Sequence, residues 1–529
     1  MQTLDWFIIA AYALGMIGLG WYVGRRQTSG EDYYLAGRSL GWFPVGVSTM
    51  ATQLGAISFI SAPAFVGLRP GGGLIWLGYE LAVPAAVILL MAVVIPVYHR
   101  MRVTSVYEVL ERRFDVRVRV TVSLIFQVSR GLATGVTIYA AAIVVSVTAG
   151  IPLWLTIVLT GAVALVYELF GGIHVDILSD TIQMIILLLG ILVVGAVGLS
   201  AVGGWSSVQA ALDPSRFQAV DFASHGLGDG RDFGFWPLFF GGLFLYLSYY
   251  GSDQSQVQRE LSTRSLDAAK GSLLFNGLAR FPIVLAYCSV GLILGAWTAH
   301  HPSFLASLPD GNVDYMLPMF IREQLPVGLT GFIFVAIFAA AMSNLDSAIN
   351  SLSAATMEDV YKKLRPGRMT EARELLLGKL FTLGWGVFCV GFAFYAGDIS
   401  PTVIESINKI GSAFYGPVFA VFLTGILVRR AAPAGALAGL VLGVGTNLLL
   451  WVFAPGVSWL WWNLFGFVLA GGCVLLWPRL RHDVPAAAEE VLFPMPGERP
   501  VWRRSYILLG VYTLLLILLL VLLPGLMGG

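Results

Sequence analysis

Long apolar runs, separated by short polar loops, follow one another along almost the whole chain. A run of about 20 apolar residues is long enough to cross the hydrocarbon core of a bilayer as a helix. Fourteen such runs cover residues 4–24, 40–67, 74–99, 118–149, 152–171, 174–202, 233–252, 268–299, 327–363, 374–396, 400–428, 432–454, 458–478 and 505–525. The pattern predicts an all-α polytopic membrane protein with about 14 transmembrane helices, forming a single transmembrane domain over residues 1–529.

The composition agrees with this class. Hydrophobic residues make up 57% of the chain and charged residues only 12%, whereas soluble domains carry about 25% charged residues. The three cysteines all fall in apolar runs, with neither a disulfide framework nor the spacing of a metal site. The basic pair Arg25-Arg26 follows the first apolar run instead of preceding it, which favours a membrane span over a cleaved signal peptide.

The positions of the basic residues predict the orientation. Of the 32 Lys and Arg residues, 25 lie in alternate loops beginning with the first, 4 lie in the opposite set of loops, and Arg130, Arg280 and Lys409 lie inside spans. Cytoplasmic loops of membrane proteins carry the excess of positive charge. We therefore expect a protein of the cell (inner) membrane with both termini external, and the acidic loop 203–232 external as well.

The ninth run continues into a polar helical stretch that is unusual for a membrane span. Ser343, Asp346, Ser347 and Asn350 recur at i, i+3, i+4 and i+7, so their side chains share one helix face. A carboxylate at this depth costs at least about 2.5–3.5 kcal/mol and marks a functional candidate. The stripe offers the oxygen ligands that hard cations prefer. The alternative is that these side chains hold neighbouring helices together.

Two apolar runs carry interruptions at matching places. The run 40–67 contains six Ser, Thr and Gln side chains, Gly55 in its middle and Pro63 near its end, and the stretch 240–254 is punctuated by glycines. Interrupted helices in two halves of a chain are typical of transporters built from inverted repeats, with the binding site between the repeats. The repeats expected here cover about 40–202 and 233–428, with flanking helices at 4–24, 432–454, 458–478 and 505–525. Gly and Pro are also generally common in membrane helices.

Ionisable residues inside the runs complete the set of candidates. They are Glu80, Arg130, Asp176, Asp180, Arg280, Asp346, Glu405 and Lys409. Two nearby carboxylates tolerate each other only with a proton or a cation between them, so Asp180 and Asp346 are candidates to share one ion. Arg130 and Arg280 suit either a substrate carboxylate or a structural ion pair.

Five stretches together resemble one known family, the sodium:solute symporters, which includes transporters of glucose, sialic acid, proline, iodide and monocarboxylates. They are the opening loop 25–38, Thr104–Phe114, Ser179–Gln183, Gly251–Arg259 and Ala339–Tyr361. The similarity extends from the opening loop to the thirteenth run. It implies a LeuT-type five-plus-five inverted repeat with extra flanking helices, and one or two Na⁺ ions as cofactors.

The resemblance implies two sodium sites. The main site, made by carbonyls of the broken second span and by the ninth span, comprises Ala51, Leu54, Ala340, Ser343 and Asn344. A second site beneath it comprises Asp180, Ser343, Asp346 and Ser347. Asn344 departs from the Ser or Thr usual in the family, which affects the geometry of the main site. Asp346 replaces a residue that is usually Ser and adds a negative charge.

The resemblance also implies a substrate site at the midplane. Its candidates are Gln53, Ser58, Tyr79, Glu80, Arg130, Tyr249, Asn276 and Asn408. The pair Tyr79-Glu80 resembles the sugar-contacting pair of sugar transporters, whereas Arg130 resembles the arginine that binds the carboxylate in sialic acid transporters. These two likenesses conflict, so a sugar, a sialic acid and a carboxylate all remain open as the substrate.

The sequence thus predicts a sodium-coupled symporter that imports a small polar organic solute by alternating access. The alternatives are a proton-coupled or uncoupled carrier on the same fold, or a membrane solute sensor, for which we see no output module after Gly529. An enzyme is not expected, since neither a zinc-protease motif nor a Gly-x-Ser-x-Gly motif is present. The expected partners are a small-molecule substrate and the lipid bilayer. Neither nucleic acid nor an obligate protein partner is expected.

Overall fold

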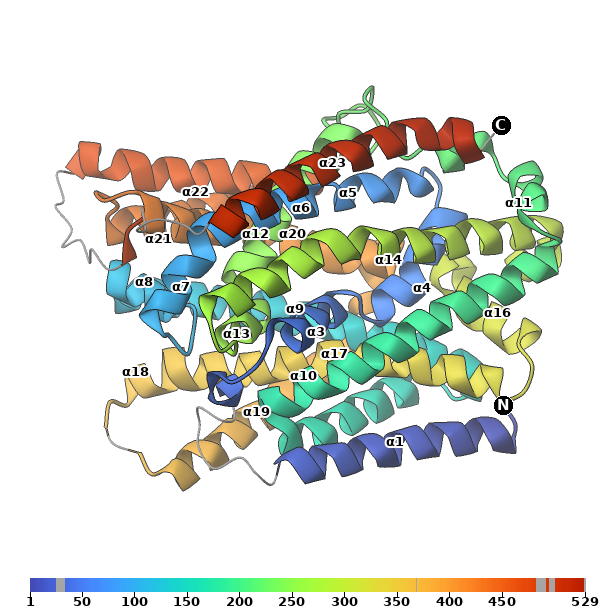
Figure 1. The fold of residues 1–529 in the computed structure, drawn as a ribbon, viewed down its shortest axis with the longest axis horizontal. Coiled ribbons are helices and arrows are strands. Elements are labelled where there is room, and N and C mark those ends of the chain that lie inside the picture. Colours follow the sequence, from blue (N-terminus) through green and yellow to red (C-terminus); the bar gives the residue numbers. More distant parts are fainter. Residues whose placement is uncertain (25–33, 368, 482–490, 494–499, 528–529) are drawn as a thin grey trace.

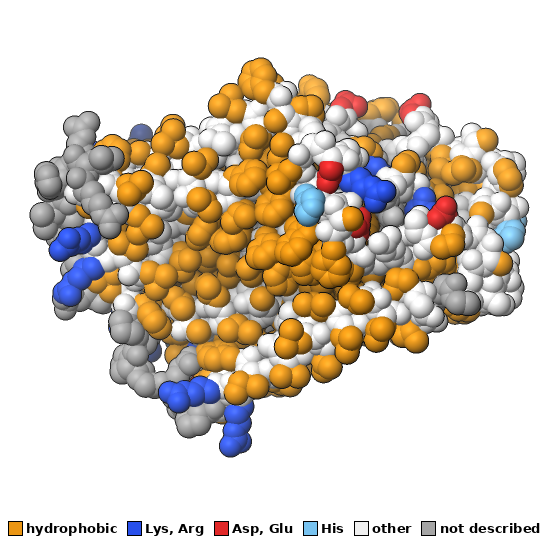
Figure 2. Space-filling model, turned by 90° about the horizontal axis from the view of Figure 1, so that it is seen from above, with side chains coloured by type: hydrophobic (Ala, Val, Ile, Leu, Met, Phe, Trp, Pro, Cys, Tyr) orange, Lys and Arg blue, Asp and Glu red, His pale blue; other side chains and the backbone are white. Residues whose placement is uncertain are grey.

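A computed structural model describes residues 1–24, 34–367, 369–481, 491–493 and 500–527. These residues form a bundle of helices that run roughly side by side, with α17 (Leu329–Ala355) passing through its middle and α1 (Thr3–Gly24) and α23 (Pro500–Met527) on opposite sides (Figure 1). Hydrophobic side chains cover much of the visible face, and several Lys and Arg side chains lie at one end (Figure 2). The arrangement is that of a multi-pass membrane protein.

Within the described residues, eleven helices are long and apolar enough to cross a membrane, and one bent pair makes a twelfth. Besides α1, α17 and α23, the long helices include α9 (Val116–Ala149), α10 (Leu153–Val202), α14 (Leu266–His300), α19 (Glu371–Ala393), α20 (Val403–Leu427), α21 (Pro433–Phe453) and α22 (Leu460–Arg481). The third predicted span is made of α5 (Leu77–Glu80), α6 (Ala82–Leu89), η3 (Leu90–Val94) and α7 (Ile95–Met101).

The expected number of about 14 full spans is therefore higher than the number found. The difference lies in two runs. The first, 152–171, contributes the shorter apolar helix Leu153–Val163 at the start of α10. The second, 233–252, contributes η5 (Pro237–Gly241) and α12 (Gly242–Ser252), which together are too short to count as a full span.

Both predicted interruptions are real breaks in helices. The second span divides into α3 (Trp42–Gln53) and α4 (Ala56–Gly67), which are bent by 52° at Leu54 and Gly55. A Cβ atom on Gly55 would lie 3.3 Å from the carbonyl oxygen of Ala340, so a glycine lets α17 approach the break closely. The other break separates α12 from α13 (Gln254–Leu261) at Asp253, whose Oδ1 accepts the Ser255 amide at 2.8 Å.

The ninth span agrees closely with its predicted limits of about 327 and 363. α17 begins at Leu329 and continues through the π-helix η8 (Thr356–Tyr361) into α18 (Lys362–Leu364). Its end is anchored where Asp359 accepts hydrogen bonds from Arg119 at 2.7 Å and from Ser105 at 2.8 Å. Almost every side chain from Ala339 to Ala355 is buried inside the protein, so the polar stripe of this helix faces other helices.

The acidic segment 203–232 folds through its own carboxylates. Asp229 accepts the backbone amides of His225 at 2.6 Å and of Gly226 at 3.1 Å. These hydrogen bonds to the charged form lower the pKa of Asp229. The segment is therefore an ordered cap, although it contains only the short helices α11 (Trp205–Ala211) and η4 (Pro214–Phe217).

Candidate functional site

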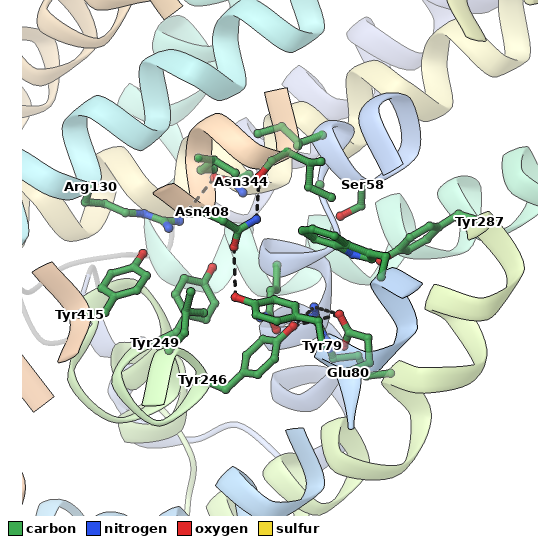
Figure 3. A pocket seen from close by; sticks show the side chains of 18 residues that line it. Ser58, Tyr79, Glu80, Arg130, Tyr246, Tyr249, Tyr287, Asn344, Asn408 and Tyr415 are labelled. Atoms are coloured by element: carbon green, nitrogen blue, oxygen red, sulfur yellow. Dashed lines mark hydrogen bonds and ion pairs between the residues drawn. The ribbon is translucent and has the colours of Figure 1, made fainter. Parts of the chain in front are cut away.

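A cavity of about 90 Å³ lies beside the break between α3 and α4 (Figure 3). Helices from both halves of the chain contribute its walls, namely α3, α4, α5, α9, α12, α14, α17 and α20. The walls include Gln53, Ser58, Tyr79, Glu80, Arg130, Tyr249 and Asn408. Seven of the eight predicted substrate residues, which are scattered over more than 350 positions of the sequence, thus meet at one place.

Asn276 is the predicted substrate residue that lies elsewhere. It is fully buried in α14, and its Nδ2 donates to the carbonyl oxygens of Gly46 at 2.9 Å and Ser272 at 3.0 Å. It does not line the cavity. In this structure the Nδ2 of Asn276 attaches α14 to α3, and substrate contact by Asn276 stays a prediction.

Glu80 and Arg280 form an ion pair in the cavity wall. The Arg280 Nε atom donates to Glu80 Oε2 at 2.5 Å and its Nη2 atom donates to Oε1 at 3.1 Å. The Tyr246 hydroxyl donates to the same Oε1 at 2.9 Å. Both oxygens of Glu80 are therefore engaged, and the two charges compensate each other.

Arg130 projects into the cavity from α9 with much looser contacts. Its Nη2 lies 3.4 Å from Asn344 Oδ1, its Nη1 lies 3.9 Å from Asp253 Oδ2, and its Nε has no hydrogen-bond partner among the described residues. The guanidinium carbon lies 5.8 Å from the centre of the Tyr249 ring. The hydroxyls of Tyr249 and Tyr415 point toward it (Figure 3). Two hydroxyl groups, from α12 and α20, therefore lie beside the Arg130 guanidinium of α9.

The predicted main sodium site surrounds the break of the second span. α3 ends at Gln53, so the carbonyl groups of its last turn lack their intrahelical amide partners. The carbonyl oxygen of Ala340 approaches the break from α17. The Asn344 Nδ2 donates to the Thr52 carbonyl at 2.8 Å. Asn344, which we expected only as a sodium ligand, also lines the substrate cavity.

Arg259 occupies the centre of the predicted second sodium site. Its Nη2 forms a salt bridge with Asp180 Oδ2 at 3.2 Å and also donates to the Ser347 hydroxyl. Its Nε donates to Ser48 Oγ at 2.7 Å. Ser343 donates to the other oxygen of Asp180. Asp180 thus has a fixed basic partner, although Arg259 lies between two apolar runs of the sequence and not inside either of them.

Asp346 lies in the same region but without a comparable partner. It is 1% exposed, and neither carboxylate oxygen has a hydrogen-bond partner among the described residues. Asp176 is equally buried and equally unpartnered among the described residues. The basic residues inside other spans are engaged elsewhere, since Arg280 pairs with Glu80 and Lys409 lies over the Trp451 ring.

The donor set fits a sodium ion. Backbone carbonyls at the break, the Ser343 hydroxyl and the unpartnered oxygens of Asp346 are all hard oxygen ligands. Within the described residues, no group of three or more His, Cys, Asp or Glu side chains is placed to hold a metal ion together. This donor set suits a monovalent cation better than a transition metal, which prefers imidazole or thiolate ligands.

Comparisons of sequence connect this chain to known proteins. Residues 33–443 match the sodium:solute symporter family. The chain is 32% identical to the sodium-dependent multivitamin transporter of Oryctolagus cuniculus over 84% of this chain and 69% of that protein. It is 31% identical to the human sodium/iodide cotransporter, over 85% of this chain and 69% of that protein. It is 28% identical to the human sodium-coupled monocarboxylate transporter 2, over 94% of this chain and 79% of that protein.

The fold gives the same result. The structure matches a substrate-bound, outward-open Na⁺-coupled sialic acid symporter with a TM-score of 0.81 and 26% identity, over 92% of this chain and 99% of that one. A nucleobase-cation-symport-1 family transporter shares the fold with a TM-score of 0.55 at 13% identity, over 89% of this chain and 97% of that one. These matches confirm the predicted LeuT-type fold. The chain therefore belongs to the sodium:solute symporter family, whose members are sodium-coupled transporters and not enzymes.

Proposed function

We propose that this symporter carries a small organic carboxylate, with the carboxylate bound by Arg130 in the cavity beside the broken second span. The observation that carries the proposal is the balance of charge in the cavity wall. Arg280 and Glu80 compensate each other at 2.5 Å, whereas the Nε of Arg130 is unpartnered among the described residues and its carboxylate neighbour, Asp253, lies 3.9 Å away. A planar guanidinium is suited to bind a carboxylate through paired hydrogen bonds.

The surroundings of Arg130 support an anion more than a neutral sugar. The hydroxyls of Tyr249 and Tyr415 point into the same space and supply further donors. Glu80 would be needed as a hydrogen-bond acceptor for sugar hydroxyls, but Arg280 and Tyr246 engage both of its oxygens. Binding a sugar there would require breaking a buried ion pair, which is costly.

The size of the cavity supports a small solute. A cavity of about 150 Å³ holds a benzene molecule, and the space here is about 90 Å³. In this conformation it suits a short-chain carboxylate better than a nine-carbon sialic acid. Two of the compared relatives are named for anions, iodide and monocarboxylates, which agrees with an anionic substrate for this chain.

We further propose that sodium binds at the break, held by Ala51, Leu54, Ala340, Ser343 and Asn344, and that Asp180, Ser343, Asp346 and Ser347 provide a second cation site. The movement of sodium down its concentration gradient supplies the free energy for uptake. Asp346 supports the second site, because a buried carboxylate without a partner is costly unless a cation or proton compensates it. In the structure Asp180 and Ser347 contact Arg259, so a cation there would compete with this guanidinium.

The charge distribution supports external termini in the cell (inner) membrane, with the cap 203–232 on the outside. We also propose that residues of about 40–202 and 233–428 are inverted repeats. Each begins with a helix broken close to the cavity, at Leu54–Gly55 in the first and at Asp253 in the second. Broken helices in equivalent places are characteristic of such repeats.

Uptake into proteoliposomes tests the function. Purified protein is reconstituted, a sodium gradient or a potassium control is imposed, and uptake of lactate, propionate, iodide, glucose and N-acetylneuraminate is measured. We expect sodium-dependent uptake of a carboxylate with little uptake of glucose. Preferred transport of glucose would reject Arg130 as an anion-binding residue, and preferred transport of iodide would keep the anion but reject the carboxylate.

A further inference from the structure

Asn344 contacts both the proposed sodium site and the proposed substrate site. Its amide nitrogen donates to the Thr52 carbonyl at the break of the second span, at 2.8 Å. Its amide oxygen faces the substrate cavity, 3.4 Å from Arg130 Nη2 (Figure 3). The side chain is only 6% exposed, and it packs against Gly55, where a Cβ atom would lie 3.4 Å from Asn344 Cβ. One buried amide therefore joins the helix break to the arginine.

The oxygen of this amide has two competing uses. It accepts the hydrogen bond from Arg130, and it is also the atom of Asn344 that can ligate a cation held at the break. A guanidinium and a metal cation on the same oxygen repel each other, and the repulsion is strong because the site is buried and poorly screened. The nearest carboxylate, Asp253 Oδ2, lies 3.9 Å from Arg130 Nη1, beyond hydrogen-bond distance, and compensates the guanidinium only in part. The remaining charge of Arg130 therefore opposes cation binding until an anion binds it.

An anion bound to Arg130 removes this opposition. Its negative charge compensates the guanidinium and its oxygens replace the long contact to Asn344. The amide oxygen is then available to the cation. By linkage, an anion that favours the cation must be favoured by the cation to the same extent.

We propose that Asn344 is the residue through which substrate binding at Arg130 and sodium binding at the helix break favour each other. This inference rests on the sodium site proposed above and deepens it. A serine at this position has a shorter side chain, so its hydroxyl ligates a cation at the break without reaching Arg130. Replacing Asn344 by serine thus separates the two functions of the residue.

The test is a double-mutant cycle on sodium binding alone, in which no substrate is needed. Purified wild type, Arg130→Gln, Asn344→Ser and the double variant are titrated with NaCl at constant ionic strength against choline chloride. Stabilisation against thermal unfolding is the readout, because a ligand that binds the folded state raises the melting temperature. We expect Arg130→Gln to lower the half-saturating sodium concentration at least threefold in the wild-type background and clearly less in the Asn344→Ser background.

Asn276→Ser is the matched control, since Asn276 is a buried asparagine that bonds to the α3 carbonyl of Gly46 but lies outside the cavity. The effect of Arg130→Gln should persist in that background. If Arg130→Gln does not elute as a single folded species, Arg130→Met, which keeps the apolar stem without the charge, replaces it in the cycle.

Three results would overturn the proposal. They are a sodium affinity that does not respond to loss of the Arg130 charge, an equal response in the Asn344→Ser background, and a wild type that sodium does not stabilise. Because the cycle uses no substrate, rejection of carboxylates in the uptake experiment would leave its outcome intact. The proposal of a carboxylate substrate and the proposal about Asn344 therefore fail separately, whereas a wild type that sodium does not stabilise would reject the sodium site itself.

Discussion

Arg280 holds the carboxylate of Glu80 through two hydrogen bonds, from Nε to Oε2 at 2.5 Å and from Nη2 to Oε1 at 3.1 Å. The two residues come from α14 and α5, in different predicted repeats, and both are at most 5% exposed. Because the charges of Glu80 and Arg280 compensate each other, the pair adds no net charge to the cavity wall. Arg130, whose carboxylate neighbour Asp253 lies 3.9 Å away, is left as the cavity-lining cation whose charge is only partly compensated.

Removing one member of this pair should be much worse than removing both. Arg280→Met leaves Glu80 buried without its cation, a change that costs about 3–5 kcal/mol. We expect a clear fall in the melting temperature of the purified protein. The double variant Glu80→Leu with Arg280→Met should recover most of the loss, because apolar residues can replace a buried pair at little cost. Equal instability of the single and double variants would contradict a structural role for the pair.

Arg130→Lys should lose substrate affinity while the protein remains folded. A lysine keeps the charge but replaces a planar fork by a point charge. Hydrogen bonds to charged groups contribute about 1.5–3 kcal/mol each, so loss of one corresponds to roughly 10- to 100-fold weaker substrate binding. The concentration dependence of carboxylate uptake measures it. Unchanged uptake with a normal melting temperature would remove Arg130 from the substrate site.

Asp346→Asn should weaken the sodium dependence of transport without changing the size of the side chain. Both oxygens of Asp346 lack a partner among the described residues, so a cation bound there is held mainly by this charge. We expect a several-fold higher half-saturating sodium concentration and a lower Hill coefficient for sodium. Asp314→Asn is a control. Asp314 is another buried aspartate with one oxygen unpartnered among the described residues, and its other oxygen accepts the Val403 amide at the start of α20. An unchanged sodium dependence in Asp346→Asn would exclude a second cation on this residue.

Labelling of single cysteines tests the orientation. Cys288, Cys389 and Cys473 are replaced by alanine, and cysteines are introduced at the exposed positions Ser215 and Ala372. In intact cells a membrane-impermeant maleimide should label the cysteine at 215 directly and the cysteine at 372 only after permeabilisation. Labelling of both from the same side would refute the predicted topology.

The two helix breaks could be predicted from the sequence because their causes are local. Gly55 in a run rich in Ser, Thr and Gln weakens the helix at that point, and the glycine is also what allows Ala340 to approach. Asn276 shows the opposite case. Its place on α14 was compatible with the cavity, but which side of that helix faces the cavity depends on how α14 packs against α3.

The pattern of apolar runs and polar stripes determined the class of this protein and its approximate spans, because each depends on side chains close together in the chain. Most residues of the cavity followed instead from the resemblance of five stretches to a known family. The tertiary structure alone decided which charges meet. Arg259 reaches Asp180 and Arg280 reaches Glu80, whereas Asp346 and the Nε of Arg130 lack partners in the described chain. Such pairings join residues about 80 to 200 positions apart. They follow from the packing of helices, which a one-dimensional pattern of residues does not contain.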